Sequence, residues 1–118
     1  MNQYAILHIP DSRYCFAVGE KELVLRLRMS REDDGTRVSL IYAQKYDFTL
    51  KRQKQQMKVC YRDRLYSYYE IRLMLQDVRF AYLFEIEEDG EIYYFSEDGV
   101  TRTYRFDEGF YNFFQMPY

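Results

Sequence analysis

Apolar and polar residues alternate along most of this chain, which is the period-two pattern of β-strands that bury one face. In the segment 23–29 every odd position is leucine or methionine, while Arg26 and Arg28 occupy the opposite face. Aromatic and β-branched residues repeat in the same way over 80–86. Shorter runs expected to be strands are Ala5–Ile9, Tyr14–Val18, Val38–Tyr42, Met57–Tyr61, Ile92–Phe95 and Thr101–Phe106. The pattern predicts an all-β fold of about eight to ten short strands.

Asp-Gly pairs separate several of these runs, and glycine supplies the positive φ that tight hairpin turns require. They occur at Asp34-Gly35, Asp89-Gly90 and Asp98-Gly99. Each is expected to be a hairpin turn. Short strands with turns at this spacing predict an antiparallel β-sandwich.

The segment Leu65–Leu75 fits two patterns, because Leu65, Tyr69 and Leu73 also form a helical i, i+4, i+8 stripe. Three tyrosines within four residues favour a pleated surface over a helix. We therefore interpret this segment as a strand. Alternation places Tyr69, Ile71, Leu73 and Leu75 toward the core and Tyr66, Tyr68, Glu70 and Arg72 outside.

A length of 118 residues allows one domain with one sizeable core. The net charge of −2 does not favour nucleic acid or an anionic membrane. The N-terminal residues lack the pattern of a secretion signal, and no segment has the run of apolar residues that a membrane helix needs. Two cysteines, Cys15 and Cys60, do not form a metal-binding or redox motif. We expect a single domain in a reducing, cytoplasmic setting.

Candidate catalytic residues are scarce. His8 is the only histidine, and it lies in a predicted strand with no nucleophile motif around it. A structural role, hydrogen-bonding from a strand edge or between sheets, is therefore favoured over general-base work. Acidic clusters fall on predicted turns, and none has the spaced oxygen ligands that would specify calcium. We expect no cofactor and no catalytic residue in this chain.

Aromatic side chains are the strongest indication of function. The chain holds 14 tyrosines and 9 phenylalanines but no tryptophan. A small core cannot bury all of them, so the surplus is expected on a surface that binds something flat or apolar. Tyr46-Asp47-Phe48 follows a predicted strand and has the pattern of a loop, where rings can stack on sugars and Asp47 can accept hydroxyl hydrogen bonds. The open alternative is that Tyr46 and Phe48 close one end of the sandwich.

Six segments along the chain carry a family pattern: Ala5–Pro10, Leu23–Arg28, Tyr46–Phe48, Leu65–Tyr69, Arg79–Phe84 and Phe113–Tyr118. In the same order, they resemble the N-terminal domain of the maltogenic amylase, cyclomaltodextrinase and neopullulanase group of family 13 glycoside hydrolases. The resemblance places a barrel after the last segment, so Phe113 and Phe114 are expected to be exposed in this chain. The resemblance implies an immunoglobulin-like β-sandwich classed as a family 34 carbohydrate-binding module. Where that family has tryptophan, this chain has Phe48 and Tyr69, and the smaller Phe48 ring lacks an N–H donor.

The resemblance also implies partners. In that group the sandwich packs over the catalytic barrel of the dimer partner and narrows its active-site cleft. We therefore expect maltodextrins or cyclodextrins as ligands, bound by Tyr46, Asp47 and Phe48, with Tyr66 and Tyr68 as secondary exposed aromatics. The other expected contacts are the barrels of the same subunit and of a second one. Residues 1–118 would form one domain, with the barrel of the parent enzyme absent from this chain. The alternative is a structural or protein-interaction sandwich that never touches sugar.

Overall fold

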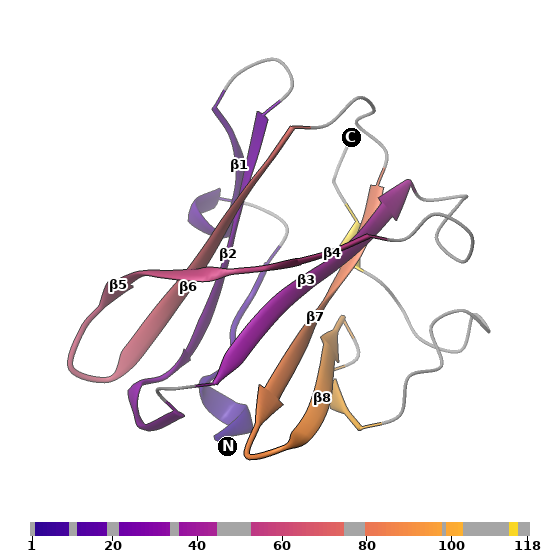
Figure 1. Ribbon diagram of the computed structural model, residues 1–118. Helices are drawn as coiled ribbons and strands as arrows, with labels where there is room; N and C mark the ends of the chain where they lie inside the picture. Colours follow the sequence, from indigo (N-terminus) through magenta and orange to yellow (C-terminus); the bar gives the residue numbers. More distant parts are fainter. Residues whose placement is uncertain are drawn as a thin grey trace.

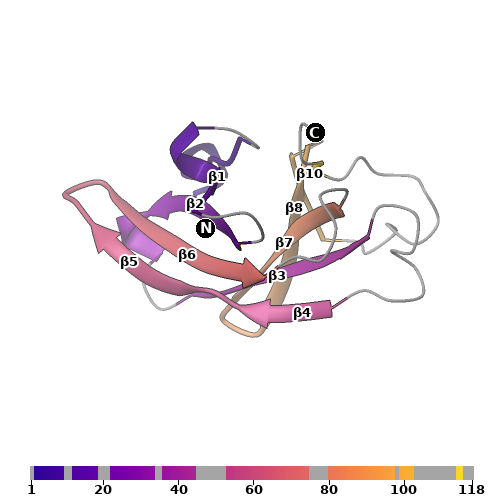
Figure 2. The same ribbon diagram turned by 90° about the horizontal axis from the view of Figure 1, so that it is seen from above.

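The computed structural model describes residues 2–9, 12–18, 22–33, 36–44, 53–74, 80–97, 99–102 and 114–115. Within these ranges the chain forms two antiparallel sheets and three short 3₁₀ helices (Figure 1). The 3₁₀ helices are η1 (Gln3–Ala5), η2 (Ser12–Tyr14) and η3 (Arg31–Asp33). The prediction of an all-β antiparallel sandwich is confirmed. Figure 2 shows the two sheets from above, facing each other across the core.

The first sheet has the strand order β1-β2-β6-β5. Its strands are β1 (Cys15–Ala17), β2 (Glu22–Ser30), β6 (Tyr66–Met74) and β5 (Lys58–Arg62). The second sheet has the order β4-β3-β7-β8-β9, and β10 also pairs with β7. Its strands are β4 (Gln53–Gln56), β3 (Arg37–Gln44), β7 (Phe80–Glu88), β8 (Glu91–Ser96), β9 (Gly99–Thr101) and β10 (Phe114–Gln115). Both sheets therefore combine strands that are distant in the sequence.

The core forms where the alternating residues of both sheets meet. Leu23, Leu25, Leu27 and Met29 of β2 are buried, as their spacing predicts. The strand assignment for 65–75 is confirmed over β6, whose Tyr69, Ile71 and Leu73 are buried; Leu75 lies outside the described residues. From the second sheet, the core receives Val38, Leu40, Tyr82, Phe84 and Ile86. Burial of these side chains is the main force that holds the sheets together.

The other face of the second sheet also buries apolar side chains. Ile41, Ala43, Ala81 and Leu83 form a separate small cluster, with Tyr94 packed against it. In the sequence these residues alternate with the core residues of β3 and β7, and all of them are apolar. A strand that is apolar at consecutive positions is typical of a strand covered on both sides.

One stretch of chain passes from the second sheet to the first. β4 pairs with β3, whereas β5 pairs with β6, and only Met57 separates the two strands. The Met57 amide donates to the Val38 carbonyl at 2.8 Å, and its side chain is buried in the core. Figures 1 and 2 show β4 and β5 following one another across the molecule. The predicted single strand Met57–Tyr61 is thus wrong at its start, because Met57 is the crossing point.

Two of the three Asp-Gly turns are confirmed. Asp89 and Gly90 have φ of 51° and 81° and join β7 to β8, and Gly99 has φ of 99° where β9 follows β8. The hairpin expected at Asp34-Gly35 is wrong. These two residues lie outside the described ranges, but the flanking β2 and β3 belong to different sheets. The connection therefore crosses the sandwich instead of closing a ladder.

The expected strand Ala5–Ile9 is also wrong. Residues 3–5 form η1, and Leu7 makes only an isolated bridge to Arg28. The Asn2 side chain accepts a hydrogen bond from the Tyr4 amide at 3.1 Å, which stabilises the 3₁₀ turn. After it the chain is held by buried Ile6 and His8, so that side-chain packing replaces a ladder.

His8 links the two sheets from the interior, and it is 4% exposed. Its Nδ1 lies 2.7 Å from the Arg26 carbonyl oxygen of β2, and its Nε2 lies 2.6 Å from the Tyr82 hydroxyl of β7. Because a carbonyl only accepts, Nδ1 carries the proton and Nε2 accepts from Tyr82. Burial lowers the pKa of His8 to about 4. The structural role expected for His8 is confirmed.

Aromatic rings surround this histidine. The ring centroids of Tyr82, Phe84 and Phe114 lie 5.3, 4.8 and 4.8 Å from that of His8, mostly edge to face. We call His8 and these three rings the buried aromatic cluster. Phe114 was expected to be exposed, as part of an exit toward a barrel. Instead it pairs with Tyr82 through β10 and is buried. Phe113, and residues 103–106 of the expected strand Thr101–Phe106, lie outside the described residues.

Candidate functional site

The outer face of the first sheet carries exposed aromatic side chains on two adjacent strands. Tyr61 comes from β5, and Tyr66 and Tyr68 come from β6; we call them the tyrosine row. The ring centroids of Tyr61 and Tyr68 are 5.9 Å apart, and those of Tyr66 and Tyr68 are 6.4 Å apart. Tyr61 is 61% exposed, while Tyr66 and Tyr68 are half-buried. The three side chains thus form one aromatic surface next to solvent.

A β-bulge brings Tyr61 to this face. The pairing of β5 with β6 shifts between Val59 and Tyr61, so that Tyr61 lies opposite Tyr68. In a regular strand Tyr61 would share the inner face with Val59, because side chains alternate at every residue. The extra residue Cys60 reverses that alternation. A local irregularity therefore adds the most exposed ring of the row.

Arg28 of β2 fixes the inner end of the row. Its guanidinium carbon lies 4.1 Å from the centroid of the Tyr66 ring, a cation–π arrangement. Its Nε also donates to the Ala5 carbonyl at 3.0 Å, which ties β2 to η1. Because the guanidinium is held on both sides, one face of Tyr66 is covered and the ring is oriented.

Asp63 shapes the turn that precedes Tyr66. Its carboxylate accepts hydrogen bonds from the Leu65 amide at 2.9 Å and the Tyr66 amide at 2.7 Å. These two bonds lower the pKa of Asp63 below its usual value. The Asp63 amide in turn donates to the Tyr66 carbonyl at 3.0 Å. A charged side chain thus closes the β5–β6 hairpin and positions the first ring of the row.

The same sheet face continues away from the row with charged pairs. Arg26 and Glu70 lie opposite each other in the ladder, and the Arg26 Nη2 is 2.9 Å from a Glu70 oxygen. The Arg26 guanidinium also lies 5.0 Å from the Phe16 ring centroid.

Burial raises the pKa of the Tyr68 phenol, and the Asp63 charge raises it further, so this hydroxyl stays protonated at neutral pH. The row therefore offers neutral rings and hydroxyls beside fixed cations.

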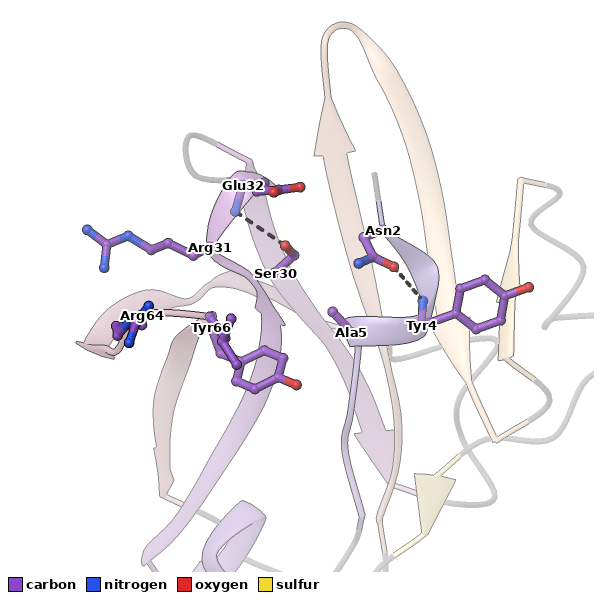
Figure 3. A pocket seen from close by; sticks show the side chains of 9 residues that line it. Asn2, Tyr4, Ala5, Ser30, Arg31, Glu32, Arg64 and Tyr66 are labelled. Atoms are coloured by element: carbon purple, nitrogen blue, oxygen red, sulfur yellow. Dashed lines mark hydrogen bonds between the residues drawn. The ribbon is translucent and has the colours of Figure 1, made fainter.

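A pocket of about 490 Å³ adjoins the row. It lies between η1, η3 and the β5–β6 hairpin, and Figure 3 shows its lining side chains. Tyr66 belongs to both the row and the pocket. The remaining lining residues are Asn2, Tyr4, Ala5, Ser30, Arg31, Glu32, Arg64 and Leu65. The aromatic surface and the pocket therefore form one continuous candidate site.

The predicted site residues fall into two groups. Tyr46, Asp47 and Phe48 lie outside the described residues, so their assignment stays a prediction. Tyr66 and Tyr68 are brought together on the surface. Tyr61 and Arg28 were missed: a bulge leaves no clear signal in the sequence, and an arginine on a strand face has no distinguishing motif. Sequence reasoning also missed the pocket, which depends on η1 and η3.

Neither a metal site nor a membrane helix is found in the part of the chain that the structure describes. No group of three or more His, Cys, Asp or Glu side chains is placed to hold a metal ion there. No helix within the described ranges is long and apolar enough to span a bilayer. The arrangement of the row and the pocket offers stacking and hydrogen bonding.

Two antiparallel sheets packed face to face define an immunoglobulin-like β-sandwich domain. The chain belongs to the family described as "Alpha amylase, N-terminal ig-like domain", whose model matches residues 1–118. A cyclomaltodextrinase from Thermoanaerobacter pseudethanolicus is 33% identical over 119 residues. That match covers 100% of this chain and 20% of the relative, so the chain spans about a fifth of that protein.

Solved structures have the same fold. A cyclomaltodextrinase structure superposes with a TM-score of 0.89 at 20% identity, over 100% of this chain and 20% of that one. A maltogenic amylase from S. marinus has a TM-score of 0.58 at 16% identity, over 86% of this chain and 13% of that one. The resemblance to the N-terminal domains of this enzyme group is therefore confirmed. The chain is a domain of the type found in cyclomaltodextrinase-like enzymes of the alpha-amylase family.

Proposed function

We propose that this chain is a non-catalytic α-glucan-binding and dimer-contact domain of an intracellular alpha-amylase-family glycosidase. Such an enzyme would hydrolyse α-1,4 and, as a further option, α-1,6 glucosidic bonds. The tyrosine row is the observation that carries the proposal, because neutral rings next to hydroxyls and fixed cations match the apolar faces and hydroxyl edges of glucose units. The match to a cyclomaltodextrinase supports maltodextrins or cyclodextrins as the ligands.

Two binding regions follow from this proposal. Tyr68 and Tyr61 offer rings that stack on glucose units, and Tyr66 extends the surface toward the pocket. The sequence segment Tyr46-Asp47-Phe48 comes after β3 and remains a predicted second region with the same chemistry. Tyr46 would stack, Asp47 would accept hydroxyl hydrogen bonds, and Phe48 would add a smaller ring.

Isothermal titration of maltoheptaose and of β-cyclodextrin into the chain tests sugar binding. The Tyr68→Ala variant is expected to weaken binding about fivefold or more, since each lost stacking ring removes roughly 1 kcal/mol. Tyr93→Ala is the matched control, because Tyr93 lies on β8 of the second sheet and is also partly exposed. Absence of heat at millimolar sugar, or equal losses in the two variants, would contradict the proposal.

A purely structural or interaction domain is the second candidate, and the exposed apolar side chains favour it. Leu65 and Met74 are 66% and 73% exposed on the same hairpin and strand as the row. Such side chains suit contact with a neighbouring domain, such as a catalytic barrel of the same or a second subunit.

A binding assay separates the two candidates. It measures whether this chain forms a complex with the Thermoanaerobacter cyclomaltodextrinase produced without the fifth of its length that matches this chain. A complex weakened by Leu65→Ser and unaffected by sugar supports the contact role. Sugar binding by the chain alone, with no complex, supports the glucan-binding role by itself.

A further inference from the structure

The pocket beside Tyr66 is large enough to hold a small molecule. Its volume of about 490 Å³ falls within the range of roughly 300–1,000 Å³ that ligand pockets occupy. Its three walls come from η1, η3 and the β5–β6 hairpin (Figure 3). These elements are distant in the sequence, so the pocket exists only because the fold brings them together.

Hydrogen bonds tie the walls to one another. The Asn2 amide donates to an Asp33 carboxylate oxygen at 2.9 Å, which joins η1 to η3. The Arg31 amide donates to the Leu65 carbonyl at 2.8 Å, and the Arg31 guanidinium donates to the Asp63 carbonyl at 2.9 Å. These contacts join η3 to the hairpin. The pocket is therefore preformed, which lowers the entropy that a ligand must lose on binding.

The lining combines an apolar surface with polar side chains. Tyr66 contributes an aromatic ring, and Leu65 beside it is 66% exposed. In Figure 3 the Glu32 carboxylate points toward Asn2, and Arg64 lies on the other side of Tyr66. Tyr4 points away from the remaining side chains and adds little to the enclosed surface.

Two charged groups of the pocket are available to a ligand. Among the residues that the structure describes, neither the Glu32 carboxylate nor the Arg64 guanidinium takes part in an ion pair or a side-chain hydrogen bond. The two side chains carry opposite charges. Glu32 would therefore repel an anionic ligand, and Arg64 would repel a cationic one. A neutral ligand that carries both donors and acceptors on its edge, and an apolar face, avoids both conflicts.

We propose that this pocket is a pyranose subsite that binds one glucose unit of an α-glucan running along the tyrosine row. Tyr66 and Leu65 contact the apolar face of the sugar. Glu32 and the side-chain NH₂ of Asn2 bond hydroxyls on one side of Tyr66, and Arg64 bonds a hydroxyl on the other side. This inference rests on the proposed glucan-binding function. It differs from that function in its residues, since neither Glu32 nor Arg64 belongs to the tyrosine row or to the segment Tyr46–Phe48.

Titration of ¹⁵N-labelled chain with maltoheptaose, followed by amide NMR, tests the subsite. Amides of Glu32, Leu65 and Tyr66 are expected to shift, and the Glu32→Gln and Arg64→Gln variants are each expected to bind about threefold to tenfold more weakly. Among the described residues neither side chain has an ion-pair or side-chain hydrogen-bond partner, so both variants are expected to retain the fold. Lys58→Gln is the matched control, because Lys58 is an exposed cation on β5 outside the pocket.

The outcomes separate the subsite from the proposed function. Shifts at Tyr61 and Tyr68 alone, with unchanged affinity in Glu32→Gln and Arg64→Gln, overturn the subsite and leave glucan binding intact. Shifts at the pocket without shifts at Tyr61 and Tyr68 support glucose binding in the pocket but overturn a glucan that runs along the row. Equal loss of affinity in Lys58→Gln overturns the subsite, since it would indicate a general charge effect. No shifts at millimolar sugar overturn both.

Discussion

The buried aromatic cluster and the tyrosine row use the same materials in opposite ways. Each combines aromatic rings with one basic side chain, His8 inside and Arg28 outside. Inside, burial keeps the imidazole neutral and both of its nitrogens are hydrogen-bonded. Outside, the Arg28 guanidinium lies over the Tyr66 ring. The difference teaches that burial, not residue type, separates the aromatics that stabilise this domain from those that are available to a partner.

Replacing one ring in each region gives the largest expected contrast. Phe84→Ala removes a fully buried ring of the buried cluster and is expected to lower the free energy of unfolding by about 3–5 kcal/mol. Tyr61→Ala removes an exposed ring of the row and is expected to change it by less than about 0.5 kcal/mol. Urea denaturation measures both values. A similar loss in the two variants would contradict the division between the regions.

Lowering the pH is expected to destabilise the domain through the buried His8 of the interior. Because the folded pKa of His8 is about 4 and its ordinary value is 6.5, the unfolded chain binds more protons between these two values. Neutral His8 therefore contributes to the free energy of unfolding fully above pH 6.5, and this contribution is lost as the pH falls. The loss reaches roughly 3 kcal/mol at pH 4.

The measurement compares urea unfolding of the chain and of His8→Gln from pH 7 to pH 4. Glutamine can keep both hydrogen bonds and does not titrate, so the stability of the variant should depend less on pH. Carboxylates such as Asp63 affect both proteins equally. Since His8 is the only histidine, its NMR resonances also report its pKa directly. A native pKa near 6.5, or parallel pH curves, would show that the interior does not exclude the charge.

Arg28→Lys is expected to have a smaller effect on stability than the changes inside the core, and it tests the role of Arg28 in the tyrosine row. Lysine keeps the charge but loses the planar contact with Tyr66 and the Nε donor to Ala5. We expect a loss of about 1 kcal/mol in stability, together with faster motion of the Tyr66 ring in NMR relaxation. Arg72→Lys, on the same sheet face, is the control. If both variants behave alike, charge alone accounts for the role of Arg28.

The alternation of apolar and polar residues correctly predicted the strands in which each residue type alone indicates whether its side chain is buried. The leucines of β2 and the aromatic residues of β6 were assigned to the correct faces, because burial and period two agree there. The segment Ala5–Ile9 was misassigned for a related reason: Ile6 and His8 alternate inward, yet the backbone pairs with β2 only at Leu7. Alternation indicates which side chains are buried. A strand also needs a neighbouring strand to pair with, and the local sequence does not indicate which one that is.

The candidate site was harder to predict than the fold. Tyr66 and Tyr68 were found because they alternate with buried residues of β6. Tyr61 was missed because a bulge changes its face, and Arg28 because its partner Tyr66 is far away in the sequence. The pocket combines residues near positions 2, 32 and 65, which meet only after both sheets have formed. Phe114 was expected to be exposed because the resemblance places a barrel after it, and its actual partner, Tyr82 of β7, is distant in the sequence.

The crossing at Met57 has a consequence for avidity. The extended segment 53–62 follows Tyr46-Asp47-Phe48 in the sequence and ends beside the tyrosine row. Ten extended residues reach at most about 33 Å, and Met57 anchors their middle in the core. If both regions bind sugar, the extended segment 53–62 is part of the chain that connects them, and its length is fixed. A glucan long enough to reach both would then have a high effective concentration for the second contact, so its affinity would rise with chain length more steeply than either contact alone predicts.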